Sequence, residues 1–228
     1  AVVPPLLAWE GHALRGELAV DLQAAGTLDA PETNGTLRVG DGYYETGSTS
    51  TILNDLEILL EAAGDTIRLA EFSANDGAGG AITGEGQLML RSEEGTPFDF
   101  TFKLDHPRLV HRDDFRTQGT GELRVTGNAD GAVLAGDLMV GPAYITIPES
   151  SGETQVTTVP FTVAQGEGEV EQAEKKVPFK MGLDLTLDFP GKVFLTGMGL
   201  DTEWEGKLKI TNQLADPAIE GVLRVKKG

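Results

Sequence analysis

Two histidines and two aspartates lie within nine residues, between His106 and Asp114, and side chains of these types can bind a metal ion. Arg108 and Arg112 lie among them, however, and no strand or helix spacing directs the four ligands toward one point. The whole sequence holds only 3 histidines, which also disfavours a histidine-rich metal site. The favoured interpretation is a charged strand edge in solvent, and the sequence predicts no metal and no cofactor.

A glycine-rich segment, Asp76 to Gly80 followed by Gly84, could hold a phosphate group with its backbone amides. It lacks the Lys-Ser/Thr pair and the following helix that such a loop has in nucleotide-binding proteins. A β-turn is therefore the favoured interpretation of these glycines.

Neighbouring carboxylates could in principle hydrolyse a glycosidic bond. The candidate pairs are Glu93 with Glu94, Asp113 with Asp114, and Glu203 with Glu205. In a chain with 36 acidic residues such pairs are expected by chance, and nothing positions a sugar between them. Trp204 could stack on a ligand, although a buried strand anchor is the simpler interpretation. The sequence therefore predicts that the protein is not an enzyme.

Composition excludes several further classes of protein. The 228 residues include 18 basic and 36 acidic side chains, giving a net charge of -18, so a nucleic-acid partner is excluded. Cys is 0, which removes disulfides and thiolate sites. The chain is long enough for a sizeable core, and it lacks the run of about 18 apolar residues that a membrane-spanning helix needs.

Strand-like alternation positions most of the apolar residues. Phe98 to Asp105 and Leu183 to Phe189 alternate apolar and polar side chains, so each run has one apolar and one charged face. The segment Ile52 to Ala63 contains good helix formers, but its apolar spacing and the turn at Ala63-Gly64-Asp65 favour a strand. We expect an all-β fold with little helix.

A short motif, Gly-x-Leu-x-Val/Ile/Leu, recurs along the chain. Its copies begin at Gly16, Gly35, Gly86, Gly121, Gly136, Gly206 and Gly221. Two copies match further, since residues 29–39 and 215–225 both place proline four residues before the glycine and Leu-Arg-Val after it. A generic preference for glycine at strand starts could explain the short motif. The longer match favours repeated strand units in a stacked, elongated sheet, with proline ending a turn and glycine starting the next strand.

These repeats and three further stretches resemble the C-terminal region of the TamB family, the inner-membrane subunit of the translocation and assembly module of Gram-negative bacteria. The stretches are Asn75 to Leu88, Leu109 to Gly127, and Val193 to Gly206, which contains Gly-Leu-Asp-x-Glu-Trp-x-Gly. The resemblance extends from about Gly16 to Gly228. It implies a long, bent sheet with an apolar concave face, called a β-taco, in the AsmA-like and bridge-like lipid-transfer superfamily.

The resemblance also implies a location and partners. It implies a periplasmic module of a protein anchored in the inner membrane, partnered by a TamA-like outer-membrane barrel, with a role in phospholipid transport and outer-membrane protein assembly. The chain is expected to be one domain, 1–228, of a longer protein. The polar segment 149–176 is expected to be a loop insertion, of which residues 165–176 could be removed at little cost to stability.

An alternating sheet without covering helices must close on a second sheet or on itself, or keep its apolar face open as a groove. Acyl chains of phospholipids are the natural occupants of such a groove. The positions expected to line this groove are Leu18, Val20, Leu37, Val39, Leu56, Ile58, Leu60, Phe98, Phe100, Phe102, Leu104, Leu123, Val125, Leu138, Val140, Leu183, Leu185, Leu187, Phe189, Leu208, Ile210, Leu223 and Val225. Two alternatives remain open: a chaperone that pairs its sheet edge with nascent outer-membrane strands, and a structural β spacer. A face filled by its own side chains would favour the spacer.

Overall fold

The computed structural model describes residues 7–9, 11–27, 30–90, 95–148 and 179–228, and within them the chain forms strands and turns without a helix. The strands are β1 (Leu7–Trp9), β2 (His12–Thr27), β3 (Ala30–Thr46), β4 (Thr51–Gly64), β5 (Thr66–Asn75), β6 (Ala81–Met89), β7 (Phe98–Asp105), β8 (Arg108–His111), β9 (Phe115–Asn128), β10 (Gly131–Thr146), β11 (Lys180–Gly197), β12 (Leu200–Gln213) and β13 (Asp216–Lys227). The expected insertion at 149–176 lies outside the described residues.

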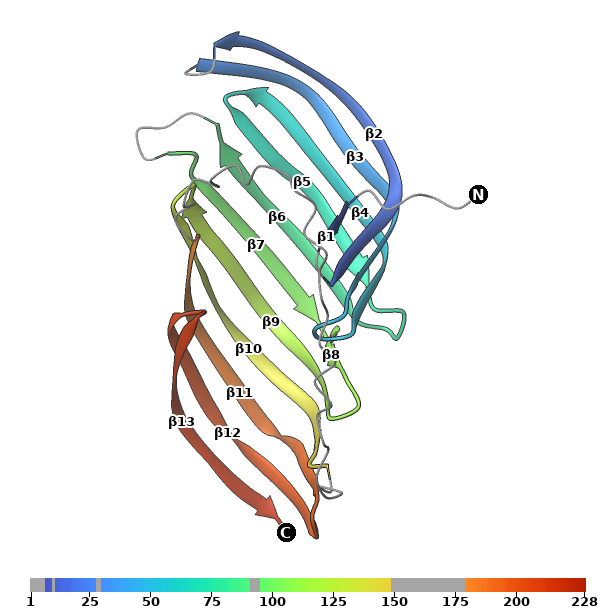
Figure 1. The fold of residues 1–228 in the computed structure, drawn as a ribbon, viewed down its shortest axis with the longest axis vertical. Helices are drawn as coiled ribbons and strands as arrows, with labels where there is room; N and C mark the ends of the chain where they lie inside the picture. Colours follow the sequence, from blue (N-terminus) through green and yellow to red (C-terminus); the bar gives the residue numbers. More distant parts are fainter. Residues whose placement is uncertain (1–6, 10, 28–29, 91–94, 149–178) are drawn as a thin grey trace, which may run out of the picture.

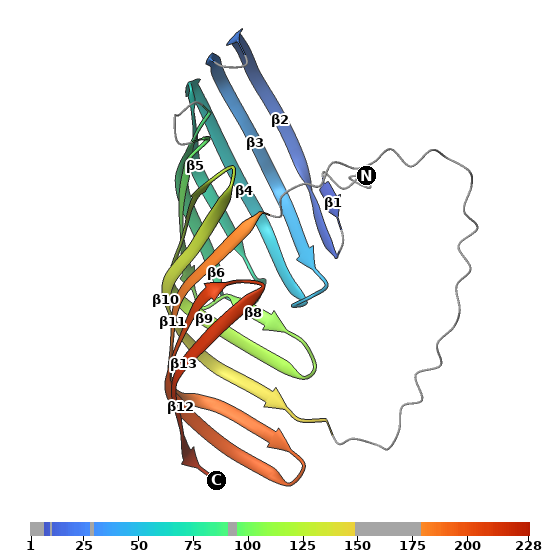
Figure 2. The ribbon, with the colours of Figure 1, turned by 60° about the vertical axis from the view of Figure 1, so that its left-hand side comes forward.

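All the strands belong to one open sheet. They follow one another in chain order from β1 to β13, except that the short β8 lies beside β9 at the end of β7. Every neighbouring pair is antiparallel apart from β10 and β11, which are parallel. Figures 1 and 2 show a single curved layer, in which β9 to β12 bend along their length. The expected all-β, taco-like sheet is confirmed, and Ile52 to Ala63 is a strand, β4.

The register of the strands collects the apolar side chains on one face, because residues directly opposite each other point the same way. Phe100 in β7, for example, lies opposite Gly86 in β6 and Val125 in β9. The same face continues through Leu187, which lies opposite Leu138 in β10 and Leu208 in β12. The opposite face carries the charged residues. The period of two therefore sets the two faces of the whole sheet.

Glycines of the repeated motif lie on this apolar face, close to the backbone of a neighbouring strand. A Cβ atom on Gly121 would lie 2.1 Å from the carbonyl oxygen of Asp137, and one on Gly206 would lie 2.1 Å from that of Val222. Both glycines also have a positive φ, at +149° and +151°, which side-chain-bearing residues rarely adopt. The repeat is thus explained by the close approach of neighbouring backbones.

One detail of the sequence interpretation is wrong. Gly35 lies inside β3 and Gly221 inside β13, and the motif proline Pro217 is already paired with Asn212. The glycines therefore lie within long strands, which begin several residues before them.

A line of irregular residues crosses the sheet from strand to strand. It comprises Gly16 in β2, Asp41 in β3, Asp55 in β4, His106 after β7, residues 141–142 in β10 and residues 190–192 in β11. Asp41, Asp55 and His106 have φ values of 47°, 47° and 52°, in the left-handed region. We call this line of irregular residues the crease; irregularities of this kind bend the strands that contain them.

Two glutamates on the polar face accept hydrogen bonds from backbone amides of the crease. The backbone N–H of Asp41 donates to Glu57 Oε1 at 3.1 Å, and that of Lys192 donates to Glu203 Oε1 at 3.2 Å. Glu203 is also paired with Lys226 at 3.3 Å. The N–H of Lys192 is the main cause that lowers the pKa of Glu203 below its ordinary value. A carboxylate on the next strand thus satisfies an amide that the irregular strand cannot pair.

A buried aspartate ties the β5–β6 turn to β8. Asp76 Oδ1 accepts the N–H groups of Ala78 at 2.7 Å and Gly80 at 2.9 Å, and its Oδ2 accepts the N–H of Arg108 at 3.0 Å. The guanidinium of Arg108 donates to Oδ2 at 3.3 Å and to the Asp76 carbonyl at 2.9 Å. Beside it Pro107 is fully buried and packs against Gly80. We call this group the Asp76 knot.

The knot bears on two sequence interpretations: the turn expected after Asp76 is present, and the interpretation of the segment after His106 is corrected. The glycine-rich turn does present backbone amides to an anion, but that anion is the carboxylate of Asp76 itself. The segment after His106 is not wholly a solvated edge, because Pro107 and Arg108 belong to the knot.

Acid is expected to destabilise the fold because it protonates two carboxylates that are hydrogen-bonded in the folded protein, those of Asp76 and Asp99. Burial tends to raise the pKa of Asp76, but the N–H groups of Ala78, Arg108 and Gly80 outweigh it and lower that pKa; the guanidinium of Arg124 lowers that of Asp99. Their stabilisation is present above the unfolded-state pKa of about 3.9 and is lost as the pH falls through the lower, folded-state values.

The measurement is the urea midpoint between pH 6 and pH 2. It should fall below about pH 4, and the fall should be shallower in Asp76→Asn, whose side chain does not titrate. A midpoint that stays constant or rises on acidification would contradict this account.

Candidate functional site: the apolar concave face

The structure places all of the expected groove positions in strands and on one connected face. Leu18 and Val20 in β2 lie opposite Val39 and Leu37 in β3, and Leu37 continues to Leu60 in β4. At the other end of the sheet, Leu223 and Val225 in β13 lie opposite Gly206 and Trp204 in β12. The face is continuous along the whole strand order; its role in binding lipid stays a prediction.

Packing on this face is dense in the middle and open toward both ends of the sheet. Leu104 in β7 is 5% exposed and Leu183 in β11 is 8% exposed, whereas Val20 in β2 is 56% exposed and Ile219 in β13 is 61% exposed. In the part of the chain that the structure describes, no second layer of strands covers the face (Figure 2). The central side chains are therefore buried by their neighbours within this one curved layer.

Two clusters form the densest parts of the concave face. The first centres on Leu53, Leu56 and Ala74, and the second on Leu104, Leu138 and Val140. β8 contributes Leu109 to the second cluster. The crease thus lies among the best-packed residues, which holds the curvature in place.

Several apolar residues of this face were missed from the sequence. They include Leu22, Ile67, Leu69, Phe72, Ile82, Leu88, Leu134 and Ile219, which lie directly opposite other members of the face. Leu69 and Phe72 are three residues apart because a register shift separates them. A strict period of two cannot find such a pair, although the run Ile67-x-Leu69 offered a short signal.

Phenylalanine rings cover the glycines of β6. A Cβ on Gly86 would lie 2.4 Å from the ring of Phe100, and one on Gly84 would lie 2.6 Å from that of Phe102. Phe72 meets Phe102 edge to face, with ring centroids 5.3 Å apart. These rings make the middle of the face continuous and aromatic.

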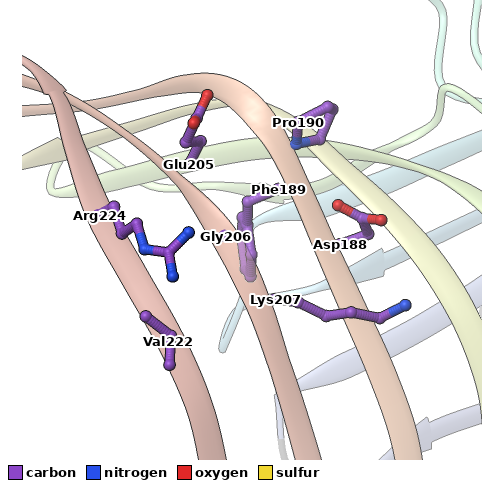
Figure 3. Close-up of a pocket in the computed structure, with 8 residues that line it drawn as sticks. All are labelled: Asp188, Phe189, Pro190, Glu205, Gly206, Lys207, Val222 and Arg224. Carbon is purple, nitrogen blue, oxygen red and sulfur yellow. The ribbon is translucent and has the colours of Figure 1, made fainter.

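The polar face carries ion pairs and shallow hollows. Arg124 donates to Asp99 at 2.8 Å, and Lys209 pairs with Asp184 at 3.1 Å. One hollow, of about 420 Å³, lies between β11, β12 and β13. Figure 3 shows the residues that line it: Asp188, Phe189, Pro190, Glu205, Gly206, Lys207, Val222 and Arg224. Its mixture of acidic and basic side chains selects no single kind of ligand.

Several of the residues considered first for chemistry are paired with neighbouring side chains. His106 bonds to its neighbour Asp105, with 2.6 Å between Nδ1 and Oδ1, and Glu203 and Glu205 share Lys226. Among the described residues, no group of three metal-ligating side chains comes together. Glu93 and Glu94 lie outside the described residues.

Trp204 is fixed within the sheet. The indole N–H of Trp204 donates to Thr202 at 2.8 Å, and the half-buried ring lies opposite Val193 and Val225, which fits a strand anchor.

Across the described ranges, no helix has the length and apolar character needed to cross a membrane.

The fold and the face define a class of protein: a one-layer, creased β-sheet module whose concave side is a continuous apolar surface. The family model of the TamB C-terminal domain matches residues 70–228, from β5 to the end of β13, and the chain therefore belongs to that family. The resemblance read from the motifs is confirmed. The four strands before β5 lie outside the match but continue the same sheet.

Searches of the curated proteins and of the solved structures find no match. Family membership makes the chain a TamB-like module of outer-membrane assembly, a non-enzymatic class of transport and assembly proteins. It also associates the chain with the periplasm of Gram-negative bacteria and with the partner TamA.

Proposed function

We propose that the concave face is a conduit that binds the acyl chains of phospholipids as they pass between the inner and outer membranes. The observation that supports this most is the continuous apolar face, open at both ends of the strand order. Phe98, Phe100, Phe102 and Leu104 form its central strand, and no charged side chain lies at the positions directly opposite them. The full-length protein, anchored in the inner membrane and docked to a TamA-like barrel, would use this face to support assembly of nascent outer-membrane proteins.

The energetics of an acyl chain favour a continuous lining over isolated sites. Transfer of a methylene group into water costs about 0.8 kcal/mol, so a sixteen-carbon chain carries roughly 10 kcal/mol or more. Twelve strands in sequence leave eleven spacings of about 4.8 Å each, so the face is on the order of 50 Å long. An unbroken face of that length lets a chain move without leaving apolar surroundings.

Photo-crosslinking along β7 tests this proposal. A photoreactive residue placed at each position from Phe98 to Asp105 of the full-length protein should give phospholipid adducts at 98, 100, 102 and 104 only, since these share the apolar face. Adducts of equal yield at odd and even positions would rule the conduit out. Circular dichroism checks that each variant is folded.

A charge on the lining should block lipid movement. Phe100→Arg or Leu185→Asp would place an unpaired charge on the apolar face, which costs several kcal/mol unless water enters. Lipid transfer by the full-length protein should fall at least tenfold, whereas the matched change Thr101→Arg, on the polar face, should have little effect. Equal loss in both kinds of variant would contradict the assignment of the faces.

A second candidate function uses the outer edge of β13. This edge has no strand beside it in the described chain, and its middle, residues 218–223, contains neither lysine nor proline. An exposed strand edge can pair with an incoming strand. If β13 serves nascent outer-membrane strands, an amphipathic strand peptide should protect the amides of 216–227 from hydrogen exchange and leave those of β7 unchanged.

A further inference from the structure

A small hollow on the outer face, beyond the crease, differs in charge from the rest of the molecule. Its volume is about 160 Å³, and it is lined by Arg108, Val110, His111, Arg116, Thr117, Gln118, Pro142 and Tyr144. None of these residues is acidic, although the chain has twice as many acidic as basic side chains. Four other hollows on the described surface each include at least one carboxylate.

Strand pairing places three hydrogen-bond donors of this hollow in one row across β8, β9 and β10. Arg116 in β9 lies directly opposite His111 in β8 and directly opposite Tyr144 in β10. Directly opposed residues have Cβ atoms about 4.5–5.5 Å apart, so the imidazole, the guanidinium and the phenol can reach a common ligand. Tyr144 also stacks on Phe194 with ring centroids 5.3 Å apart, which steadies the phenol ring.

The charge of Arg116 is left uncompensated. Within the described residues its guanidinium has no carboxylate within 4.0 Å, whereas Arg108 is held by Asp76 and Arg112 by Asp114. The carboxylates of Asp76 and Asp114 are thus already bound to other arginines. An additional anion would meet Arg116 without displacing an existing ion pair.

We propose that this hollow binds a phosphate group. A phosphate oxygen accepts hydrogen bonds from a guanidinium in a two-pronged geometry, and the hydroxyl of Tyr144, the amide of Gln118 and the ring N–H of His111 supply further donors. The volume is smaller than the about 300–1,000 Å³ of clefts that enclose drug-sized ligands, so it fits a headgroup and not a whole lipid. Soluble phosphate esters and phospholipid headgroups share this chemistry.

The test measures binding of inorganic phosphate, of glycerol 3-phosphate, and of vesicles containing phosphatidylglycerol or only phosphatidylcholine, to the 228-residue protein at 0.15 M ionic strength. Arg116→Gln should weaken binding of the phosphate ligands at least tenfold, and Arg116→Lys should restore part of it. The matched control is Arg224→Gln, which removes an arginine from the mixed-charge hollow of Figure 3 and should leave binding unchanged.

The arms of the experiment identify the source of the phosphate. Arg116-dependent binding of the soluble phosphates assigns the hollow to small phosphate esters, and Arg116-dependent binding of phosphatidylglycerol vesicles alone assigns it to a membrane headgroup. Absence of binding in every arm, or binding that Arg116→Gln and Arg224→Gln weaken equally, overturns the proposal. Because the hollow lies outside the apolar face, failure here leaves the crosslinking test of the conduit unaffected.

Discussion

Replacing Asp76 by alanine is expected to lower the free energy of unfolding by about 3 kcal/mol or more. The substitution removes the acceptor of three backbone amides and the partner of Arg108. The Ala78 amide is at the surface and can bond to water, but Gly80 is buried, so its N–H would remain unsatisfied. The side chain of Asp76 is 1% exposed, whereas that of Arg108 is 32% exposed. Most of the lost stability therefore comes from the buried groups that bond to the carboxylate, and less from the Arg108 guanidinium, which water can reach.

Urea unfolding followed by circular dichroism gives the change in free energy. Asp76→Asn keeps one acceptor oxygen and should lose less, about 1–2 kcal/mol. The control is Asp114→Ala, which removes the partner of Arg112 from an exposed ion pair and should leave the midpoint unchanged. Asp76→Ala unfolding at the same urea concentration as Asp114→Ala would show that the knot contributes no more than a surface pair.

The knot illustrates what the sequence could not predict. Asp76 and Arg108 are 32 residues apart, and nothing in either segment signals the other. The glycines after Asp76 correctly predicted a turn, and the amides of that turn do bind an anion. Its identity as an internal carboxylate follows only from the meeting of the β5–β6 turn with β8.

The two faces of the sheet, by contrast, could be predicted residue by residue. Alternation in Phe98 to Asp105 and in Leu183 to Phe189 gave the inward positions, because a strand has no other period. The prediction stopped at the crease, where an extra residue shifts the alternation. Leu53 and Leu56 share one cluster despite their spacing of three, and only the pairing with β3 reveals the shift at Asp55.

Short alternating runs also limited how much of the lining was found. After each irregularity in a strand, the sequence identified further lining positions only where the next alternating run was long. Short runs such as Ile67-x-Leu69 were left out, although the register places them beside Leu60 and Leu88. The candidate face is therefore larger than the sequence indicated, and it belongs to more strands.

Replacing Gly121 by alanine is expected to destabilise the protein by about 3–5 kcal/mol, from two sources. A non-glycine residue in a sparsely populated φ/ψ region costs on the order of 1–3 kcal/mol. In addition, the new Cβ would lie 2.1 Å from the carbonyl oxygen of Asp137, so β9 and β10 must separate at the centre of the sheet. The control is Gly40→Ala, whose Cβ would first meet the flexible carboxylate of Glu57 at 3.5 Å and should change stability by less than about 1 kcal/mol.

A substitution at a glycine of the edge strand distinguishes a local effect on one strand from a loss of global stability. Gly221→Ala creates the same clash, 2.1 Å from the carbonyl oxygen of Lys207, at a φ of +146°. β13 is paired on one side only, so it can move away without opening the rest of the sheet. Hydrogen exchange should therefore speed up in 216–227 alone, with a smaller shift in the urea midpoint than Gly121→Ala produces. If Gly121→Ala were as mild as Gly40→Ala, the close backbone approach would not explain why the repeat requires glycine.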